Sequence, residues 1–153
     1  ADIRICDIKN FIEIVLNKFQ DKNVAAVTVP NYVYPEEEIF SDKFFHFIFN
    51  FLVSVSNKIG IGGGRGECQI IRKSYLKKVG GYNNKLVVAE DVDLFERLKK
   101  IGKVIYLPDI KVYESPRRFR KSGYLKTFSL YITNFIFMKL FKRSFSKEWK
   151  PIR

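Results

Sequence analysis

Cysteine, histidine and tryptophan are scarce in this chain, whose 153 residues include two cysteines, one histidine and one tryptophan. Cys6 and Cys68 lie too far apart to form a Cys-x-x-Cys redox or metal pair, so we expect two reduced thiols in a cytosolic protein. The single histidine, His46, lies in a phenylalanine-rich segment, where we expect packing or an interface and not catalysis. The start of the chain lacks a signal-peptide pattern. Its opening Ala-Asp-Ile-Arg without Met suggests a fragment or a processed chain.

Long uninterrupted apolar runs are also missing. The densest apolar segment, residues 39–58, contains Asp42, Lys43, His46 and Asn50, whereas a membrane-spanning helix needs roughly 20 consecutive apolar residues. We therefore predict a helix over residues 39–58 that is buried on several sides or rests on a membrane, and does not cross it.

Acidic residues are nearly absent from the last part of the chain. Residues 117–153 carry 11 Lys and Arg against one acidic residue, Glu148, whereas residues 1–116 carry 17 against 15. The basic excess is a property of the tail, which predicts a local anionic partner. The phosphates of a sugar nucleotide, anionic lipid headgroups and nucleic acid all meet this description.

What is present is a globular composition, with 46% hydrophobic and 29% charged residues, and a length that suits one domain. Segments with helical periodicity alternate with short β-branched runs. These patterns predict helices over residues 8–19, 39–58 and 90–100, and a further helix from residue 121 onward. Asp7 would cap the first of these helices. A short additional helix would be capped by Ser74 and ended by Gly80-Gly81. They predict strands over residues 24–29, 68–71, 104–107 and 110–113, and a loop over 31–38. This order indicates an α/β domain with a mixed sheet.

A glycine-rich segment, residues 60–66, lies between two of these elements. A phosphate-binding loop would need a Lys-Ser/Thr pair at fixed spacing, and a dinucleotide-binding loop would need a strand before it and a helix after it. Neither pattern is found. We expect the glycines to let the backbone pass close to a ligand or turn tightly.

Three ordered motifs carry the most specific signal. Arg-Lys-Ser-Tyr-Leu-Lys-Lys-Val-Gly-Gly-Tyr-Asn (72–83) is followed by Ala-Glu-Asp-Val-Asp-Leu-Phe-Glu-Arg-Leu (89–98) and by Gly-Lys-Val-Ile-Tyr-Leu (102–107). Together they resemble the second half of family 2 glycosyltransferases, and the opening Ala-Asp-Ile, the first helix and Val-Ala-Ala-Val-Thr look like the region after that family's Asp-x-Asp motif. The resemblance covers nearly the whole chain. It implies the acceptor-binding half of a GT-A-like mixed sheet flanked by helices, incomplete at its N-terminus.

The resemblance implies transfer of a sugar, with inversion, from a nucleotide-diphosphate sugar to a hydroxyl acceptor. Asp91 would be the general base, and Glu90, Gly64 and Arg65 would bind the acceptor. A carboxylate at a helix N-terminus is held ionised by the helix dipole and by free backbone N–H groups, so we expect Asp91 to be anionic. The alternative is that Glu90, Asp91 and Asp93 merely cap a helix.

The same resemblance implies how the donor is held. Arg117, Arg118 and Arg120 would grip its diphosphate through forked, charge-assisted hydrogen bonds. Asp2 matches the second Asp of the metal motif, and Glu114 stands near the place of a histidine ligand. The two would therefore contribute to a site for a divalent metal, Mg²⁺ or Mn²⁺. A solvated Asp2 at the end of a strand is the open alternative.

We predict a partial catalytic domain over residues 1–123 and a basic amphipathic helical tail over residues 124–153. The tail either lies in the headgroup region of a membrane or packs on the domain. The expected partners are the nucleotide-sugar donor and a lipid-linked or polysaccharide acceptor of the cell envelope, with a membrane surface as an open alternative; nucleic acid is not expected. The expected location is the cytoplasm, and peripheral contact with the cytoplasmic face of the membrane stays open.

Two other functional classes remain as alternatives. The first is a nucleic-acid-binding module, which the basic tail favours and which the acidic cluster at residues 90–93 argues against, since it would repel phosphates. The second is a domain that binds a membrane surface without catalysis.

Overall fold

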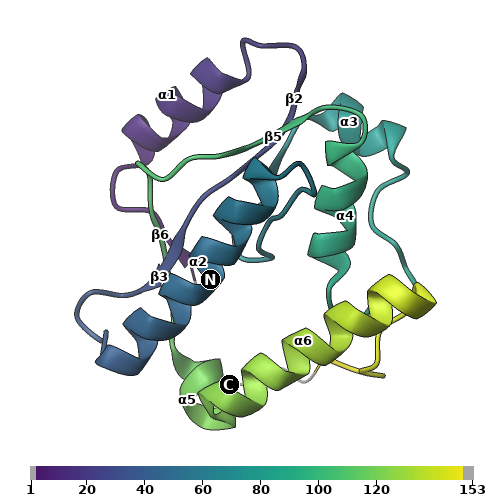
Figure 1. Cartoon of the computed structure of the whole chain (residues 1–153). Coiled ribbons are helices and arrows are strands. Elements are labelled where there is room, and N and C mark those ends of the chain that lie inside the picture. The colour runs from purple at the N-terminus through teal and green to yellow at the C-terminus, as the bar shows by residue number, and fades with distance from the viewer. Residues whose placement is uncertain (1–2, 150–153) are drawn as a thin grey trace.

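The computed structural model describes residues 3–149. Within them there are six strands, which form two small sheets, and six helices, which lie on the faces of the sheets (Figure 1). In chain order the elements are β1 (Ile3–Arg4), α1 (Ile8–Lys18), β2 (Val24–Thr28), β3 (Asn31–Val33), α2 (Phe40–Lys58), β4 (Ile70–Ile71), α3 (Lys73–Lys78), α4 (Glu90–Lys99), β5 (Lys103–Tyr106), β6 (Val112–Glu114), α5 (Arg117–Ser122) and α6 (Tyr124–Phe141). The predicted α/β class, with mixed sheets flanked by helices, is confirmed.

Each sheet combines parallel and antiparallel pairs. The first has the order β1-β6-β3, in which β6 runs antiparallel to β1 and parallel to β3. The second has the order β4-β2-β5, in which β2 runs antiparallel to β4 and parallel to β5. The prediction of a loop over residues 31–38 is wrong at its start, because Asn31–Val33 forms β3. A three-residue strand after Pro30 has no periodic signal of its own, and only its pairing with β6 defines it.

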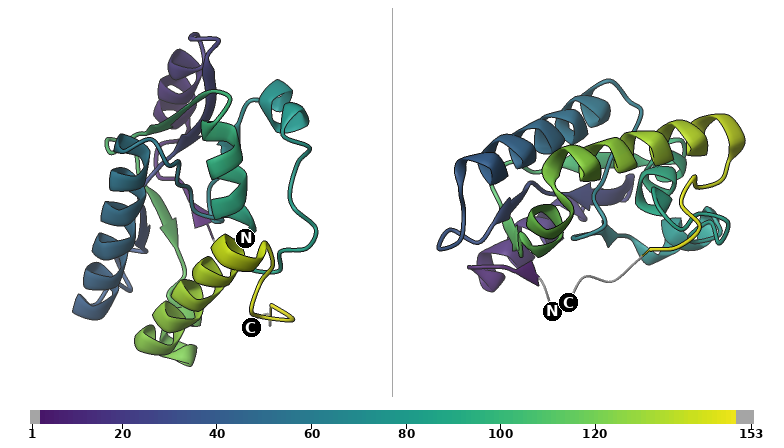
Figure 2. Two further views of the ribbon diagram at one scale, coloured as in Figure 1. Left: turned by 45° about the vertical axis from the view of Figure 1, so that its right-hand side comes forward. Right: turned by 90° about the horizontal axis from the view of Figure 1, so that it is seen from below.

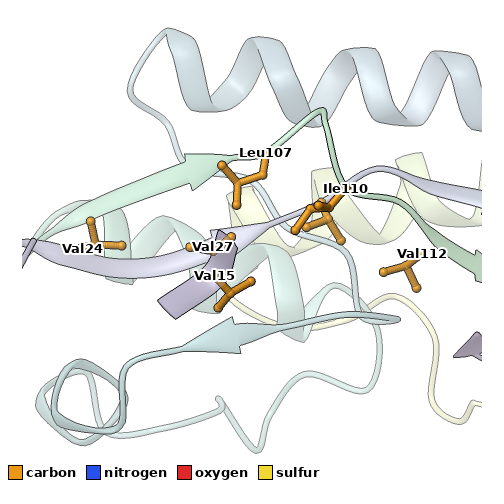
Figure 3. Packing of buried hydrophobic residues seen from close by; sticks show 7 residues of the cluster. Val15, Val24, Val27, Leu107, Ile110 and Val112 are labelled. Carbon is orange, nitrogen blue, oxygen red and sulfur yellow. The ribbon is translucent and has the colours of Figure 1, made fainter. Parts of the chain in front are cut away.

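Strand β2 lies at the centre of the core. All its residues are buried, and Val24 and Val27 share one apolar cluster with Val15 of α1 (Figure 3). Ala26 belongs to a second cluster, built with Leu94 of α4. A strand that is covered on both faces has a continuous apolar sequence instead of an alternating one, and this explains why the strand was recognisable over residues 24–29.

Helix α1 begins as predicted, because the side chain of Asp7 accepts a hydrogen bond from the backbone N–H of Asn10 at 2.9 Å. Its apolar stripe is less buried than the periodicity suggests. Val15 is buried, whereas Ile8, Ile12 and Leu16 are exposed. The stripe is therefore wider than the surface that the neighbouring strands cover.

The start of α3 differs from the prediction. The helix begins at Lys73 with Arg72 as its N-cap, so Ser74 lies inside the helix and does not cap it. The Arg72 guanidinium donates hydrogen bonds to three backbone carbonyl groups of the segment from α1 to β2. Those long-range bonds have no local sequence signal. The end is as predicted, since Gly80 and Gly81 follow the helix with φ angles of 76° and 73°.

Helices α2 and α6 lie side by side on one side of the molecule, and α1 lies on the other (Figure 2). Within the predicted tail, residues Tyr124–Phe141 form α6. This helix packs on α2 through Phe49, whose ring centroid lies 5.7 Å from those of both Phe128 and Tyr131. An ion pair between Lys139 and Glu96 joins α6 to α4. None of the helices within residues 3–149 is both long and apolar enough to cross a membrane.

Candidate active site

A cavity of about 740 Å³ lies between α2, the glycine-rich loop, the start of α4, the end of β6, α5 and α6. Its volume falls within the range of roughly 300–1,000 Å³ that is usual for small-molecule sites. Apolar side chains of α2 and α6 form much of its wall. The charged side chains in its lining are Arg65 and Glu67 of the loop, Glu90, Asp91 and Glu96 of α4, Glu114 of β6, and Arg117 and Arg118 of α5.

Most of the site residues predicted from the sequence meet in this cavity. Those in its lining are Glu90, Asp91, Gly64, Arg65, Glu114, Arg117 and Arg118. Arg120 is not part of the lining, and Asp2 lies outside the described residues. Asp91 and the first two arginines of α5 are thus brought to one cavity by different elements.

The glycine-rich loop packs tightly against two helices. A methyl group at Gly64 would lie 2.6 Å from ring carbons of Phe95, and one at Gly62 would lie 2.7 Å from the Phe95 carbonyl oxygen. The glycines therefore let the backbone approach α4. The sequence predicted a close approach to a ligand or a tight turn, whereas the close neighbour here is a helix. The loop also passes the candidate base, since a methyl group at Gly66 would lie 3.5 Å from Oδ2 of Asp91.

Asp91 lies in the first turn of α4, behind Ala89, whose φ of 67° is left-handed. Its Oδ1 accepts a hydrogen bond from the backbone N–H of Val92 at 2.8 Å. Burial, followed by the negative charges of Glu90 and Glu67, raises the pKa of Asp91 to about 7. We expected the helix N-terminus to favour the ionised form, but burial and the neighbouring negative charges outweigh the hydrogen bond from Val92 and the charge of Arg65. A carboxylate with a pKa near neutrality suits a general base.

Arg65 is buried beside the cavity between two carboxylates. Its Nη2 donates to Glu114 at 2.7 Å, and its Nε donates to Glu67 at 3.2 Å. Its Nη1 lies 3.1 Å from Nδ1 of His46. An acceptor that bound to Arg65, as the sequence predicts, would compete with these partners.

The two carboxylates of this cluster share one guanidinium. Burial and the charge of Glu67 raise the pKa of Glu114 to about 8. Burial opposes ionisation of Glu67 as well, but Arg65 holds the pKa of Glu67 below its usual value. Burial and the charge of Arg65 lower the pKa of His46 to about 4. His46 is therefore neutral near pH 7, and it is packed in the interior, as expected.

The three arginines of α5 divide between two tasks. Arg117 and Arg118 line the cavity, and the guanidinium of Arg118 lies 4.0 Å above the ring of Trp149. Arg120 instead donates to the Asp42 carboxylate at 2.7 Å and to the backbone carbonyl of Glu37. The predicted grip of three arginines is thus reduced to two at the cavity, and the third ties α5 to α2. Arg120 lies two positions after Arg118, more than half a turn further around a helix of about 3.6 residues per turn, so the two side chains point in different directions.

The predicted metal site includes Asp2, which lies outside the described residues, and it stays a prediction. Within residues 3–149, no three His, Cys, Asp or Glu side chains converge to hold a metal ion. Glu114 is already paired with Arg65. Ile3, which follows Asp2 in the sequence, is the β-register partner of Glu114. The described residues alone do not offer the oxygen donor set that a divalent metal needs.

The sequence patterns did not single out Glu67 or Asn31. The Asn31 side-chain amide donates to Oε2 of Glu67 at 3.2 Å, and Glu67 in turn raises the pKa values of Asp91 and Glu114. An acidic residue directly after a glycine-rich loop and next to Arg65 is a weak local signal. Nothing in the sequence spacing connects it with Glu114.

Comparison with known proteins gives one match. A family model described as glycosyl transferase family 21 matches residues 1–123, a span that contains every charged residue of the cavity lining. No curated protein and no solved structure matches the chain. The class of protein inferred from the three motifs is therefore supported, with family 21 and not specifically family 2 as the family matched.

Proposed function

This chain belongs to glycosyl transferase family 21, and we propose that its cavity is the acceptor-side catalytic site of an enzyme that moves a sugar from a nucleotide-diphosphate sugar to a hydroxyl acceptor. One observation carries the proposal. The candidate base Asp91 and the cations Arg117 and Arg118 line the same cavity. Attack by an alcohol and departure of a diphosphate can both be assisted in one partly desolvated space, where electrostatic interactions are stronger than in water.

Asp91 takes the proton from the acceptor hydroxyl as its oxygen attacks the anomeric carbon. Oδ1 is engaged by the N–H of Val92, which leaves Oδ2, the oxygen beside Gly66, to receive the proton. A positioned base typically contributes about 10²–10⁴-fold in rate, and it works best with a pKa near the working pH. Glu90 lines the cavity next to the base and contacts the acceptor. The resemblance to family 2 enzymes favours a single displacement with inversion.

Arg117 and Arg118 stabilise the departing nucleoside diphosphate. As the new glycosidic bond forms, the bond between the anomeric carbon and the phosphate oxygen breaks, and negative charge develops on that oxygen. Guanidinium groups match phosphate geometry with paired, charge-assisted hydrogen bonds.

The wall of the cavity bears on the choice of acceptor. Phe49 and Leu52 of α2 face the same space as Tyr131 and Phe135 of α6. An apolar wall of this kind favours an acceptor with a hydrocarbon part. Of the two acceptors expected from the sequence, we therefore propose the lipid-linked one over the polysaccharide. We also propose that the protein is cytoplasmic.

A divalent metal, Mg²⁺ or Mn²⁺, is a separate part of the proposal. It would neutralise the donor diphosphate, with Asp2 and Glu114 as its predicted ligands. Glu114 is already paired with Arg65. Loss of transfer on chelation with EDTA and recovery with Mn²⁺ would support it, and undiminished transfer in EDTA would remove it.

The central experiment measures release of nucleoside diphosphate from a panel of UDP- and GDP-sugars, with a membrane lipid extract as the source of acceptors. We expect turnover of at least one donor, and Asp91→Asn should lower kcat/KM by about 10²–10⁴-fold. Asp93→Asn is the matched control, because Asp93 lies two residues along the same helix, pairs with Arg97 at 2.7 Å and is not part of the lining. An Asp91→Asn enzyme as active as the wild type would disprove the base assignment, and no turnover of any donor would disprove the proposed activity of this chain.

A further inference from the structure

Helices α2 and α6 turn polar side chains toward the protein interior. The buried polar residues are Asp42, His46, Asn50 and Asn57 on α2, and Thr127 and Asn134 on α6. Most of them have hydrogen-bond partners inside. Asn50 exchanges two bonds with the backbone of Asn31, and the Asn134 amide donates to the hydroxyl of Ser146 at 2.9 Å.

The opposite faces of the same two helices are apolar and exposed. On α2 they carry Phe40, Phe44, Phe47 and Phe51, and on α6 Leu125, Ile132, Ile136 and Leu140. Both sets are spaced by three, four or seven residues, which places each set on one side of its helix. Phe40 and Leu125 are 80% and 85% exposed. A helix that faces water on its outer side shows the reverse pattern, with apolar residues inside and polar residues outside.

The two apolar faces belong to one surface. α2 and α6 lie side by side, on the side of the molecule away from α1 (Figure 2). Their inner rings interlock, with centroids 5.6 Å apart for Phe45 and Tyr124 and 5.7 Å apart for Phe49 and Phe128. We call the outer side of these two helices the α2–α6 face. Exposed apolar surface as extended as this marks an interaction site.

Basic residues accompany the α2–α6 face. Lys43 and Lys58 are exposed on α2, Lys126 on α6, and Lys142 and Arg143 just after it. Residues 117–153 contain only one acidic residue. Lysine and arginine side chains beside an apolar helix face are the pattern of interfacial binding to anionic lipid, in which the apolar groups enter the headgroup and acyl boundary and the cations meet phosphates.

We propose that the α2–α6 face is a docking surface for an anionic lipid bilayer, in which both helices lie flat in the interface. The inference does not depend on the proposed reaction, since it rests on the inverted faces and the basic residues alone. Docking through this face would also fix where the cavity lies relative to the bilayer. Ile132 belongs both to this face and to the cavity lining, so the cavity adjoins the docked surface.

The test is flotation of the whole chain with phosphatidylcholine vesicles that contain or lack phosphatidylserine. We expect flotation with the anionic vesicles and much less with the neutral ones. Phe44→Ser/Phe47→Ser on α2 and Ile136→Ser/Leu140→Ser on α6 should each weaken binding by about tenfold or more, because each pair removes two apolar side chains from the interface. These positions are exposed, and the circular dichroism spectra of the variants should match the wild type.

Ile12→Ser/Leu16→Ser is the matched control, because it removes two exposed apolar side chains from α1, on the other side of the molecule. It should float like the wild type. Equal losses from the α1 pair and the α2 pair would overturn the assignment of the face, and equal flotation on both vesicles would overturn the role of charge. If the chain does not float but sediments as a dimer that the α2 and α6 pairs dissociate, the face binds a second copy and the lipid proposal is wrong.

Discussion

The guanidinium of Arg65 donates a hydrogen bond to the carboxylate of Glu114 at 2.7 Å, although 49 residues separate them in the sequence. Glu67 accepts from the same guanidinium, so one cation serves the buried carboxylate of Glu114 and the half-buried carboxylate of Glu67 at the edge of the cavity. Removal of one partner of a buried ion pair leaves an uncompensated buried charge.

We expect Arg65→Met to destabilise the fold by about 3–5 kcal/mol. The loss should be smaller at pH 5 than at pH 8. A carboxyl group such as that of Glu114, whose pKa is raised in the folded protein, contributes stability at low pH, and this stability is lost as the pH rises through that pKa. Urea unfolding at both pH values measures it. Arg4→Met is the control, because Arg4 pairs with Glu36 at the surface, and it should change stability little. Equal losses for the two variants would contradict the buried role of Arg65.

The pH dependence of activity should reflect Asp91. Because burial and Glu90 raise the pKa of Asp91 to about 7, and the base must be ionised to work, kcat/KM should rise with pH through about 7. Glu90→Gln removes the negative charge that raises the pKa of Asp91 most, so it should move the rising limb to lower pH. Glu13→Gln on α1, an exposed position, should leave the limb in place. A limb that Glu90→Gln does not move would show that another group titrates.

The raised pKa of Asp91 also predicts a conflict between stability and activity. The folded protein holds the proton of Asp91 up to about pH 7, whereas an unfolded Asp releases it near pH 4. Stability is therefore lost as the pH rises through this window. Asp91→Asn avoids the loss, so it should stabilise the protein by about 1–3 kcal/mol at pH 8 and hardly at pH 4. Thermal unfolding at the two pH values decides this, and destabilisation at pH 8 would contradict it.

The arginines of α5 should separate in function. Arg118→Gln should weaken binding of the donor by on the order of tenfold, because it removes a cation from the cavity. Arg120→Gln should leave donor binding close to wild type, since Arg120 pairs with Asp42 outside the lining. Inhibition by free UDP or GDP, depending on the donor used, measures the difference. Equal effects of the two substitutions would show that Arg120 also reaches the diphosphate.

The glycine-rich loop should tolerate a methyl group at one position and not at another. Gly64→Ala places a carbon 2.6 Å from the Phe95 ring, and overpacking of this kind costs about 1–3 kcal/mol. Gly66→Ala meets only Oδ2 of Asp91 at 3.5 Å and the side chain of Gln69 at 3.9 Å, so its cost in stability should be smaller. Chemical unfolding compares the two. A larger loss for Gly66→Ala would mean that the loop does not pack on α4 as described.

Local patterns in the sequence were sufficient to locate α1, α2, α4 and α6 and the most buried strand, whereas they missed the start of α3 and most of α5. Asp7 caps α1, the run from Val24 forms β2, and Glu90 starts α4, because capping, continuous apolar runs and helical periodicity are properties of neighbouring residues. The three motifs around Asp91 likewise indicated a sugar-transferring enzyme, and the match to glycosyl transferase family 21 supports that class. The roles of individual residues stay predictions.

Only the tertiary structure decided which distant residues meet and which faces remain uncovered. The pairing of β3 with β6, the sharing of Arg65 by Glu67 and Glu114, and the turn of Arg120 toward Asp42 all join segments far apart in the sequence. The spacing of Phe40, Phe44, Phe47 and Phe51 shows that they share one face of a helix. Which face of that helix turns toward the interior is set by the hydrogen-bond partners of Asp42 and Asn50. Periodicity determines a stripe, and packing determines its environment.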